Sequence, residues 1–202
     1  ELVRIFASNG KALGTGYVNP NSLICARVVS RDVSRVLDVS LMEERIRRAL
    51  ALREMLYDQP YYRLVFGESD GLPGLVVDRF ADVLVVQLNT AGMQAREAEV
   101  LEALQTVLQP SGVLWRNDSS IRSFEGLSTF VRVASGEVPD VVELIENGAR
   151  FEAPLVDGQK TGWFYDQRAN RQQMVKWVEG RRVLDVFSYV GGWGIQALLA
   201  GA

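Results

Sequence analysis

Residues 183–202 read Val-Leu-Asp-Val-Phe-Ser-Tyr-Val-Gly-Gly-Trp-Gly-Ile-Gln-Ala-Leu-Leu-Ala-Gly-Ala, an apolar run followed by glycines and small residues. The apolar run from Val183 to Phe187 predicts a strand, Gly191-Gly192 predicts a turn, and the residues after them predict a helix. A strand that passes through a glycine turn into a helix opens a doubly wound α/β sheet. Glycines let a ligand approach the backbone, and a helix N-terminus offers free N–H groups. The stretch therefore predicts a nucleotide or cofactor site at the turn.

The residues of the turn narrow the class of ligand. The turn has neither the G-x-G-x-x-G spacing of a dinucleotide site nor the G-x-x-x-x-G-K-[ST] spacing of a P-loop. Instead, Asp185 lies at the end of the predicted strand, and Phe187, Ser188 and Tyr189 follow it. A carboxylate here can accept hydrogen bonds from a cofactor, and aromatic rings can cover an apolar or sulfonium portion. Core packing is the alternative interpretation of Phe187 and Tyr189.

Three separate motifs resemble one protein family. Residues 159–171 read Gln-Lys-Thr-Gly-Trp-Phe-Tyr-Asp-Gln-Arg-Ala-Asn-Arg, and Val-Leu-Asp-x-Phe-x-Tyr-x-Gly-Gly follows at residues 183–192. Together they resemble the ribosomal RNA large-subunit methyltransferases of the cytosine-C5 type, which have a related guanine-N7 branch. Residues 16–28 are similar to the closing half of that family's PUA barrel, and residues 70–78 are similar to its central domain. The resemblance covers essentially the whole chain, in order.

The resemblance implies S-adenosylmethionine as the cofactor and suggests the residues that bind it. The implied residues are Asp185, Phe187, Ser188, Tyr189, Gly191 and Gly192 on the turn, with Phe164, Asp166, Arg168 and Arg171 on the preceding motif. For Arg168 and Arg171, a salt-bridged helix start is the alternative interpretation. The catalytic motif of the family lies beyond the turn, and so does the cysteine nucleophile of its cytosine branch. We therefore expect no catalytic residue in these 202 residues, and no methyl transfer by them alone.

The composition excludes several classes of chemistry. The chain has no histidine and a single cysteine, Cys25, which excludes Ser-His and Cys-His catalysis, internal disulfides and the common metal-ligand sets. No apolar run approaches the roughly 18 residues of a membrane span, and no signal segment opens the chain. We expect no metal site, no membrane contact and a cytoplasmic location.

The charge distribution bears on RNA binding. The net charge of −3 argues against a strongly basic surface, because phosphate contacts need clustered Lys and Arg. Arginines nevertheless concentrate in one stretch, where they can form bidentate phosphate contacts. The candidate RNA-binding residues are Arg27, Arg31, Arg45, Arg47 and Arg48. A solvated helix face is the alternative interpretation of each of them.

The chain divides into three predicted regions. Residues 1–39 predict three short strands, too few for an independent core, and are interpreted as a partial PUA-like RNA-binding barrel. Residues 40–140 predict a central α+β domain, a small sheet with a helix on one face. Residues 141–202 predict the start of a class I methyltransferase domain, the first β-α unit of a Rossmann-like fold. The absence of an initial Met and the end at Ala202 predict truncation at both ends.

Several elements are predicted with bounds. Ser40, with Glu43 three residues on, predicts the N-cap of a helix that reaches residue 57. Asn147-Gly148 between two apolar runs predicts a hairpin. The remaining predictions are strands at Tyr61–Phe66, Leu75–Arg79, Val83–Leu88, Val113–Arg116, Val141–Glu146 and Arg150–Pro154, and a helix at Gln94–Leu108.

Together these features predict a cytoplasmic S-adenosylmethionine-dependent RNA methyltransferase whose partner is ribosomal RNA, with homodimerisation left open. Cytosine-C5 is the favoured acceptor because of the resemblance. Two alternatives stay open: a methyltransferase that acts on guanine-N7 or on a small molecule, and a non-enzymatic module that binds RNA through its arginines.

Overall fold

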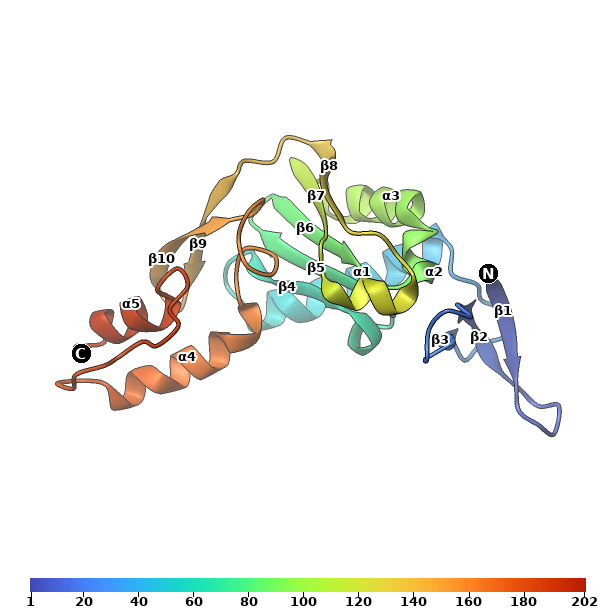
Figure 1. The fold of residues 1–202 in the computed structure, drawn as a ribbon, viewed down its shortest axis with the longest axis horizontal. Coiled ribbons are helices and arrows are strands. Elements are labelled where there is room, and N and C mark those ends of the chain that lie inside the picture. Colours follow the sequence, from blue (N-terminus) through green and yellow to red (C-terminus); the bar gives the residue numbers. More distant parts are fainter. The chain divides into compact units, whose positions relative to one another are not determined.

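The computed structural model describes residues 1–202 and divides them into two compact units, Glu1–Val138 and Pro139–Ala202 (Figure 1). The first unit contains two antiparallel or mixed sheets and two long helices, and the second contains a hairpin and short helices. None of the helices combines the length and the apolar character that a membrane span requires.

The first 39 residues form the predicted three strands. These are β1 (Leu2–Phe6), β2 (Ala12–Val18) and β3 (Ala26–Ser30), which pair antiparallel in the order β1-β2-β3. Glycine allows the close approach of β3 to β2, because a Cβ on Gly16 would lie 2.0 Å from the Arg27 carbonyl oxygen.

A five-stranded mixed sheet is the centre of the first unit. Its order is β4-β5-β6-β7-β8, and only β6 and β7 are parallel. The crossover between β6 and β7 is helical, as a parallel connection requires. The strands are β4 (Tyr61–Phe66), β5 (Leu75–Phe80), β6 (Val83–Leu88), β7 (Gly112–Asn117) and β8 (Phe130–Gly136). The first four were predicted to within about one residue, whereas β8 was not predicted.

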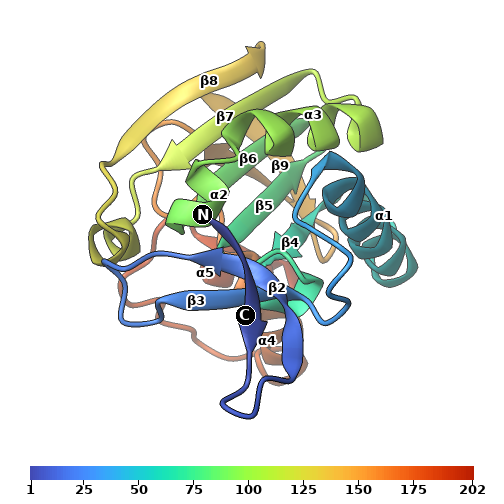
Figure 2. The ribbon, with the colours of Figure 1, turned by 90° about the vertical axis from the view of Figure 1, so that its right-hand side faces the viewer.

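Two helices pack beside each other and share the core of this unit with the central sheet (Figure 2). They are α1 (Val39–Leu56) and α3 (Glu97–Leu108). Ile46 of α1 and Leu104 of α3 are fully buried, and so is the large ring of Trp115 on β7. Each such side chain contributes about 1.5–3 kcal/mol to folding.

Two helix predictions needed correction. The N-cap of α1 is Asp38 rather than Ser40, because the Asp38 carboxylate accepts a 2.8 Å hydrogen bond from the Leu41 N–H. A carboxylate at the N-cap accepts a hydrogen bond from a free N–H. Its negative charge also interacts favourably with the positive end of the helix dipole. The predicted helix Gln94–Leu108 is interrupted, with α2 (Ala91–Gln94) and α3 separated by a short break.

The strands β1–β3 are joined to the central sheet by a buried tyrosine. The Tyr17 hydroxyl donates to the Pro73 carbonyl at 2.8 Å and lies 2.8 Å from the Thr90 hydroxyl. Burial raises the pKa of Tyr17 to about 12, because the buried phenol is shielded from water. Gly92 makes room for the ring, since a Cβ there would lie 2.3 Å from it.

The second unit begins with the predicted hairpin. Strands β9 (Val141–Glu146) and β10 (Ala149–Pro154) pair antiparallel, with Glu146 opposite Ala149. Asn147 and Gly148 have φ values of +51° and +82°, as a type I′ turn requires. The elements after the hairpin are η3 (Tyr165–Gln167), α4 (Arg168–Met174), η4 (Val175–Trp177) and α5 (Gly192–Leu199).

The strand predicted at Val183–Phe187 is not present. Leu184 and Phe187 are 85% and 100% exposed, and no strand of residues 1–202 pairs with this segment. A strand exists only through hydrogen bonds to a neighbouring strand, so apolar periodicity alone does not form one. The predicted helix after the glycine turn is present as α5.

Candidate functional site

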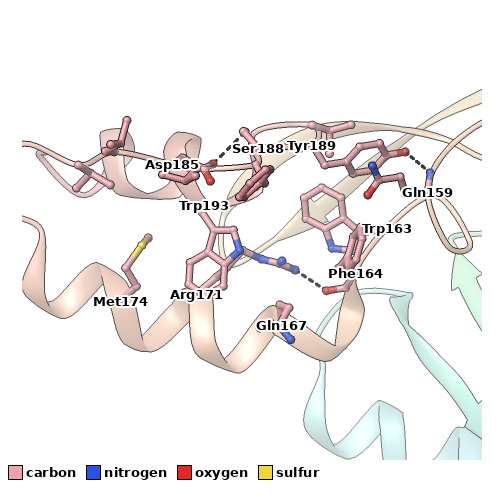
Figure 3. A pocket seen from close by; sticks show the side chains of 16 residues that line it. Gln159, Trp163, Phe164, Gln167, Arg171, Met174, Asp185, Ser188, Tyr189 and Trp193 are labelled. Atoms are coloured by element: carbon pink, nitrogen blue, oxygen red, sulfur yellow. Dashed lines mark hydrogen bonds between the residues drawn. The ribbon is translucent and has the colours of Figure 1, made fainter.

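A cavity of about 360 Å³ lies in the second unit, between the chain around α4 and the segment that leads into α5 (Figure 3). Binding sites for small molecules typically occupy about 300–1,000 Å³. The residues that line it are Gln159, Trp163, Phe164, Gln167, Arg171, Met174, Val183, Leu184, Asp185, Val186, Phe187, Ser188, Tyr189, Val190, Gly192 and Trp193.

The cavity collects most of the residues that sequence motifs suggested for a cofactor. Those that line it are Phe164, Arg171, Asp185, Phe187, Ser188, Tyr189 and Gly192. Those that do not are Asp166, Arg168 and Gly191. Gly191 instead shapes the turn before α5, where its φ of +77° is a conformation that glycine adopts without strain.

Asp185 is the acidic group of the cavity. Its Oδ2 accepts hydrogen bonds from the Ser188 hydroxyl at 3.0 Å and from the Gly194 N–H at 3.2 Å. Gly194 belongs to the first turn of α5, so the carboxylate lies at the positive end of the helix dipole. Its Oδ1 accepts no hydrogen bond within the protein. Asp185 is therefore oriented through one oxygen, and the other is available to a ligand.

Aromatic rings form much of the wall (Figure 3). The rings of Phe164 and Tyr189 meet edge to face with their centroids 5.9 Å apart. The Tyr189 hydroxyl accepts a 3.0 Å hydrogen bond from the Gln159 N–H, which fixes the ring against the preceding loop. Trp163 and Trp193 add two larger rings. Such a wall suits a flat apolar ring or a cation.

Glu146, at the end of β9, is a buried carboxylate that accepts hydrogen bonds from several elements around the cavity. Its Oε1 accepts from Arg171 Nε at 2.5 Å and from Gln196 Nε2 at 3.0 Å. Its Oε2 accepts from Arg171 Nη2 at 2.9 Å and from Trp163 Nε1 at 2.8 Å. Because Arg171 Nη2 also donates to the Phe164 carbonyl at 2.9 Å, one carboxylate links β9, the loop before α4, α4 and α5. Glu146 is 0% exposed and Arg171 is 2% exposed.

Asp166 does not line the cavity, but it pairs with Lys160, which contacts the lining residue Phe164. The Lys160 ammonium lies 3.0 Å from Asp166 Oδ2 and 4.3 Å from the centroid of the Phe164 ring. Burial acts to raise the pKa of Asp166, but the hydrogen bond and the charge of Lys160 outweigh burial and leave that pKa lowered. The pair therefore supports a ring that lines the cavity.

Several lining residues were not predicted. Trp163, Gln159 and Gln167 fall inside the motif at residues 159–171, and Trp193 follows the glycine pair. Met174 lies three residues after Arg171 on α4, hence on the same helix face. That spacing was a usable signal for Met174. For the two tryptophans the available signal was their position inside the motifs.

The arginines predicted to bind RNA divide into two groups, and the first group is engaged within the fold. The half-buried Arg27 lies 3.3 Å from the Glu125 carboxylate. Arg45 donates to the Val29 carbonyl at 2.6 Å and to the Gly71 carbonyl. The carbonyls that Arg45 contacts lie in β3 and in the loop before β5. These two guanidinium groups join parts of the first unit and do not extend from its surface.

The second group of arginines is exposed. Arg47 reaches Glu43 one helical turn earlier at 3.4 Å, a weak surface pair. Arg31 and Arg48 are exposed and have no ion-pair partner. Of the five arginines predicted to bind RNA, Arg31, Arg47 and Arg48 therefore offer a guanidinium to a phosphate.

Glu125 joins the N-terminal strands to the central sheet. Its carboxylate accepts from Asn19 at 2.9 Å, from Ser22 at 2.8 Å and from the Ala91 N–H at 3.2 Å, and it pairs with Arg27. Burial acts to raise the pKa of Glu125, but these hydrogen bonds outweigh burial and leave the pKa lowered.

This lowered pKa predicts a pH-dependent contribution to stability. A carboxyl group whose pKa is lowered by folding stabilises the fold above its unfolded pKa of about 4.3 and loses that effect as the pH falls through the folded value. We expect Glu125→Gln to lower the unfolding temperature at neutral pH, and the difference from wild type to shrink between about pH 5 and pH 3. Circular dichroism melts measure this, with the exposed Glu102→Gln as the control. A difference that stays constant over this range would contradict the assignment.

Two family models match the chain. Residues 72–202 match the model described as S-adenosylmethionine-dependent methyltransferase, and residues 1–31 match the model of a PUA-like domain. The first match includes the whole cavity, and the second includes β1, β2 and β3.

Curated relatives share the name ribosomal RNA large subunit methyltransferase I. Those from Aliivibrio fischeri (strain MJ11), Photobacterium profundum and Escherichia coli O157:H7 are 39%, 40% and 37% identical to this chain. Each alignment covers 100% of this chain and 52% of the relative. The chain thus spans about half the length of the curated relatives it matches.

Solved structures share the fold. A structure from Streptococcus mutans, of a protein assigned as an S-adenosylmethionine-dependent methyltransferase, superposes with a TM-score of 0.86 at 22% identity and covers 100% of this chain and 53% of that chain. The structure of SMU.776, assigned as a methyltransferase and complexed with SAH, gives the same TM-score and identity, with 52% of that chain covered. At this identity the likeness concerns the fold.

Proposed function

Because this chain belongs to the family of S-adenosylmethionine-dependent methyltransferases, we propose that the protein methylates a base of large-subunit ribosomal RNA, with S-adenosylmethionine bound in the cavity of the second unit. The name shared by the curated relatives supports the choice of RNA. The observation that carries the proposal is the cavity itself, where Asp185 and five aromatic residues lie beside the glycine turn.

The lining residues fit S-adenosylmethionine. The volume of about 360 Å³ suits a ligand of that size. Asp185 Oδ1 can accept a hydrogen bond from an amino or hydroxyl group, and the rings of Phe164 and Tyr189 offer faces and edges to a purine or a sulfonium. Gly192 carries no side chain, which lets the Trp163 ring pack against the start of α5, since a Cβ on Gly192 would lie 3.0 Å from Trp163 Cη2.

Each residue has a distinct task in this proposal. When bound, S-adenosylmethionine supplies the activated methyl group. Asp185 orients the ligand through its available oxygen while Ser188 and Gly194 hold the other. The aromatic wall excludes water and favours a cation over its ring faces. The protein's part is positioning and electrostatics.

We favour cytosine-C5 as the acceptor because of the motif resemblance at residues 159–192. In that chemistry a cysteine thiolate adds to the ring and activates C5, whereas methylation at guanine-N7 needs no covalent nucleophile. These 202 residues alone are expected to transfer no methyl group. The test therefore uses a protein that contains them and has the full length of the curated relatives. It is incubated with labelled S-adenosylmethionine and unmodified large-subunit RNA, and the nucleosides are analysed by mass spectrometry. Label in 5-methylcytidine supports the proposal, label in 7-methylguanosine favours the alternative, and unlabelled RNA contradicts both.

We propose that RNA contacts the first unit at Arg31, Arg47 and Arg48. We also propose that the enzyme is cytoplasmic, where ribosomal RNA is found. Each arginine that contacts a phosphate should contribute about 0.7–0.9 to the slope of log affinity against log salt. We expect the combined change to Ala at these three positions to weaken RNA binding and flatten that slope, and to leave S-adenosylhomocysteine binding unchanged. Filter binding at several salt concentrations measures the slope.

The matched control changes three exposed arginines of the second unit, Arg150, Arg181 and Arg182, to Ala. Both triple variants alter the net charge equally, so a general charge effect would flatten both slopes alike. An equal effect would contradict the assignment to the first unit. Arg27 and Arg45 are left unchanged because their loss would disturb the fold.

A further inference from the structure

We infer that Glu146 sets the charge of the cofactor cavity: by neutralising Arg171, it lets the cavity accept a positively charged ligand. The inference rests on the proposed function and concerns how the cavity distinguishes the cationic methyl donor from its neutral product. Glu146 itself does not line the cavity, so it acts through Arg171 as a positioning residue.

Arg171 presents a cation to the wall of the cavity. It lines the cavity, and its guanidinium carbon lies 4.8 Å from the centroid of the Trp163 ring and 6.0 Å from that of Trp193. The two nitrogens Nε and Nη2 are both bound by Glu146, at 2.5 and 2.9 Å. This bidentate geometry is the strongest form of an Arg–carboxylate pair. With Glu146 in place, the wall carries a neutral ion pair.

The remaining charges show what the cavity would accept. Arg171 and Asp185 are the only lining residues that carry a formal charge. With Arg171 neutralised by Glu146, the carboxylate of Asp185 leaves the site with a net negative charge. Lys160 lies near the Phe164 ring, but Asp166 balances it at 3.0 Å. The site therefore has a net negative charge only with the Glu146–Arg171 ion pair in place.

Stability alone gives little reason for this ion pair. Replacing a buried pair by apolar residues of similar volume is often neutral or stabilising. Removing one partner instead leaves an uncompensated charge in a low-dielectric site, where its field on a ligand is strong. The methyl donor carries a sulfonium charge that its product lacks. Loss of Glu146 should therefore act on the donor far more than on the product.

The test compares the affinities of the protein for S-adenosylmethionine and S-adenosylhomocysteine by calorimetry. Glu146→Gln keeps an acceptor for Trp163 and removes the charge. We expect this variant to lose about five- to tenfold more affinity for S-adenosylmethionine than for S-adenosylhomocysteine, because the unpaired Arg171 charge, partly screened by water, repels only the sulfonium. A purely structural role would weaken both ligands by the same factor, and that result would overturn the inference.

Further variants keep the test decisive. Glu146→Gln combined with Arg171→Met removes both charges and should restore the wild-type ratio of the two affinities. Arg171→Met alone leaves the carboxylate and should move the ratio toward S-adenosylmethionine, so it carries the test if Glu146→Gln does not fold. A double variant that keeps the altered ratio, or an Arg171→Met ratio that does not move, overturns the inference. A wild-type protein that binds neither ligand contradicts the proposed function instead.

Discussion

Replacing Asp185 by Ala should weaken the binding of S-adenosylhomocysteine by about 1–3 kcal/mol, or roughly 5- to 150-fold in Kd. The loss has two physical sources. The Oδ1 acceptor disappears, and the Ser188 hydroxyl and the Gly194 N–H lose the partner that orders the turn before α5. Calorimetry with S-adenosylhomocysteine measures the change.

Two companion variants separate these sources. Asp185→Asn keeps an oxygen acceptor but removes the charge, so it should fall between wild type and Asp185→Ala. Glu152→Ala removes the same charge from an exposed position on β10 outside the cavity, and it should leave the affinity unchanged. A folded Asp185→Ala variant that binds S-adenosylhomocysteine with wild-type affinity would show that Asp185 has a purely structural role.

Local sequence patterns predicted the elements whose partners are close in the chain. The hairpin of β9 and β10 follows from Asn147-Gly148, because only a type I′ turn suits those two residues between apolar runs. The helix α5 likewise follows from its small residues after the glycine turn. The segment Val183–Phe187 shows the limit of such patterns. Its apolar run predicts a strand, but the pairing that makes a strand depends on a neighbour elsewhere in the fold.

The candidate site was predictable only in part, for a similar reason. The motifs at residues 159–171 and 183–192 suggested which side chains approach the cofactor, and most of them line one cavity. Glu146 was not predicted although it adjoins the predicted turn. Its partners Trp163, Arg171 and Gln196 lie 17, 25 and 50 residues away in sequence. A buried ion pair of this kind has no local signature, and only the folded structure reveals it.

Clustering in sequence also differs from clustering on a surface. Arg45, Arg47 and Arg48 lie within one turn of α1, yet successive residues of a helix point in different directions. Arg45 therefore faces the loop that carries Gly71, while Arg47 and Arg48 face solvent. The RNA-binding assignment for this segment consequently narrows to its exposed members, together with Arg31.

Replacing Trp163 by Ala should cause the largest loss of stability in the second unit, about 3–5 kcal/mol. The ring is 2% exposed, and its centroid lies 4.7 Å from that of Phe151. Its Nε1 donates to Glu146, so the substitution removes ring packing and also one hydrogen bond of a buried carboxylate. Because the same ring lines the cavity, binding of S-adenosylhomocysteine should fall together with stability.

The matched control is Trp177→Ala, which removes the same side chain from a position that is 79% exposed. Surface substitutions of this kind usually change stability by less than about 0.5 kcal/mol. Thermal unfolding should therefore separate the two variants by several degrees. Trp163→Phe keeps a smaller apolar ring and leaves Glu146 without one hydrogen-bond donor, so its stability should lie between those of wild type and Trp163→Ala. An unfolding temperature of Trp163→Ala equal to those of Trp177→Ala and the wild type would show that Glu146 and Trp163 do not hold the cavity walls together. That result would also remove the support for a preformed cofactor site.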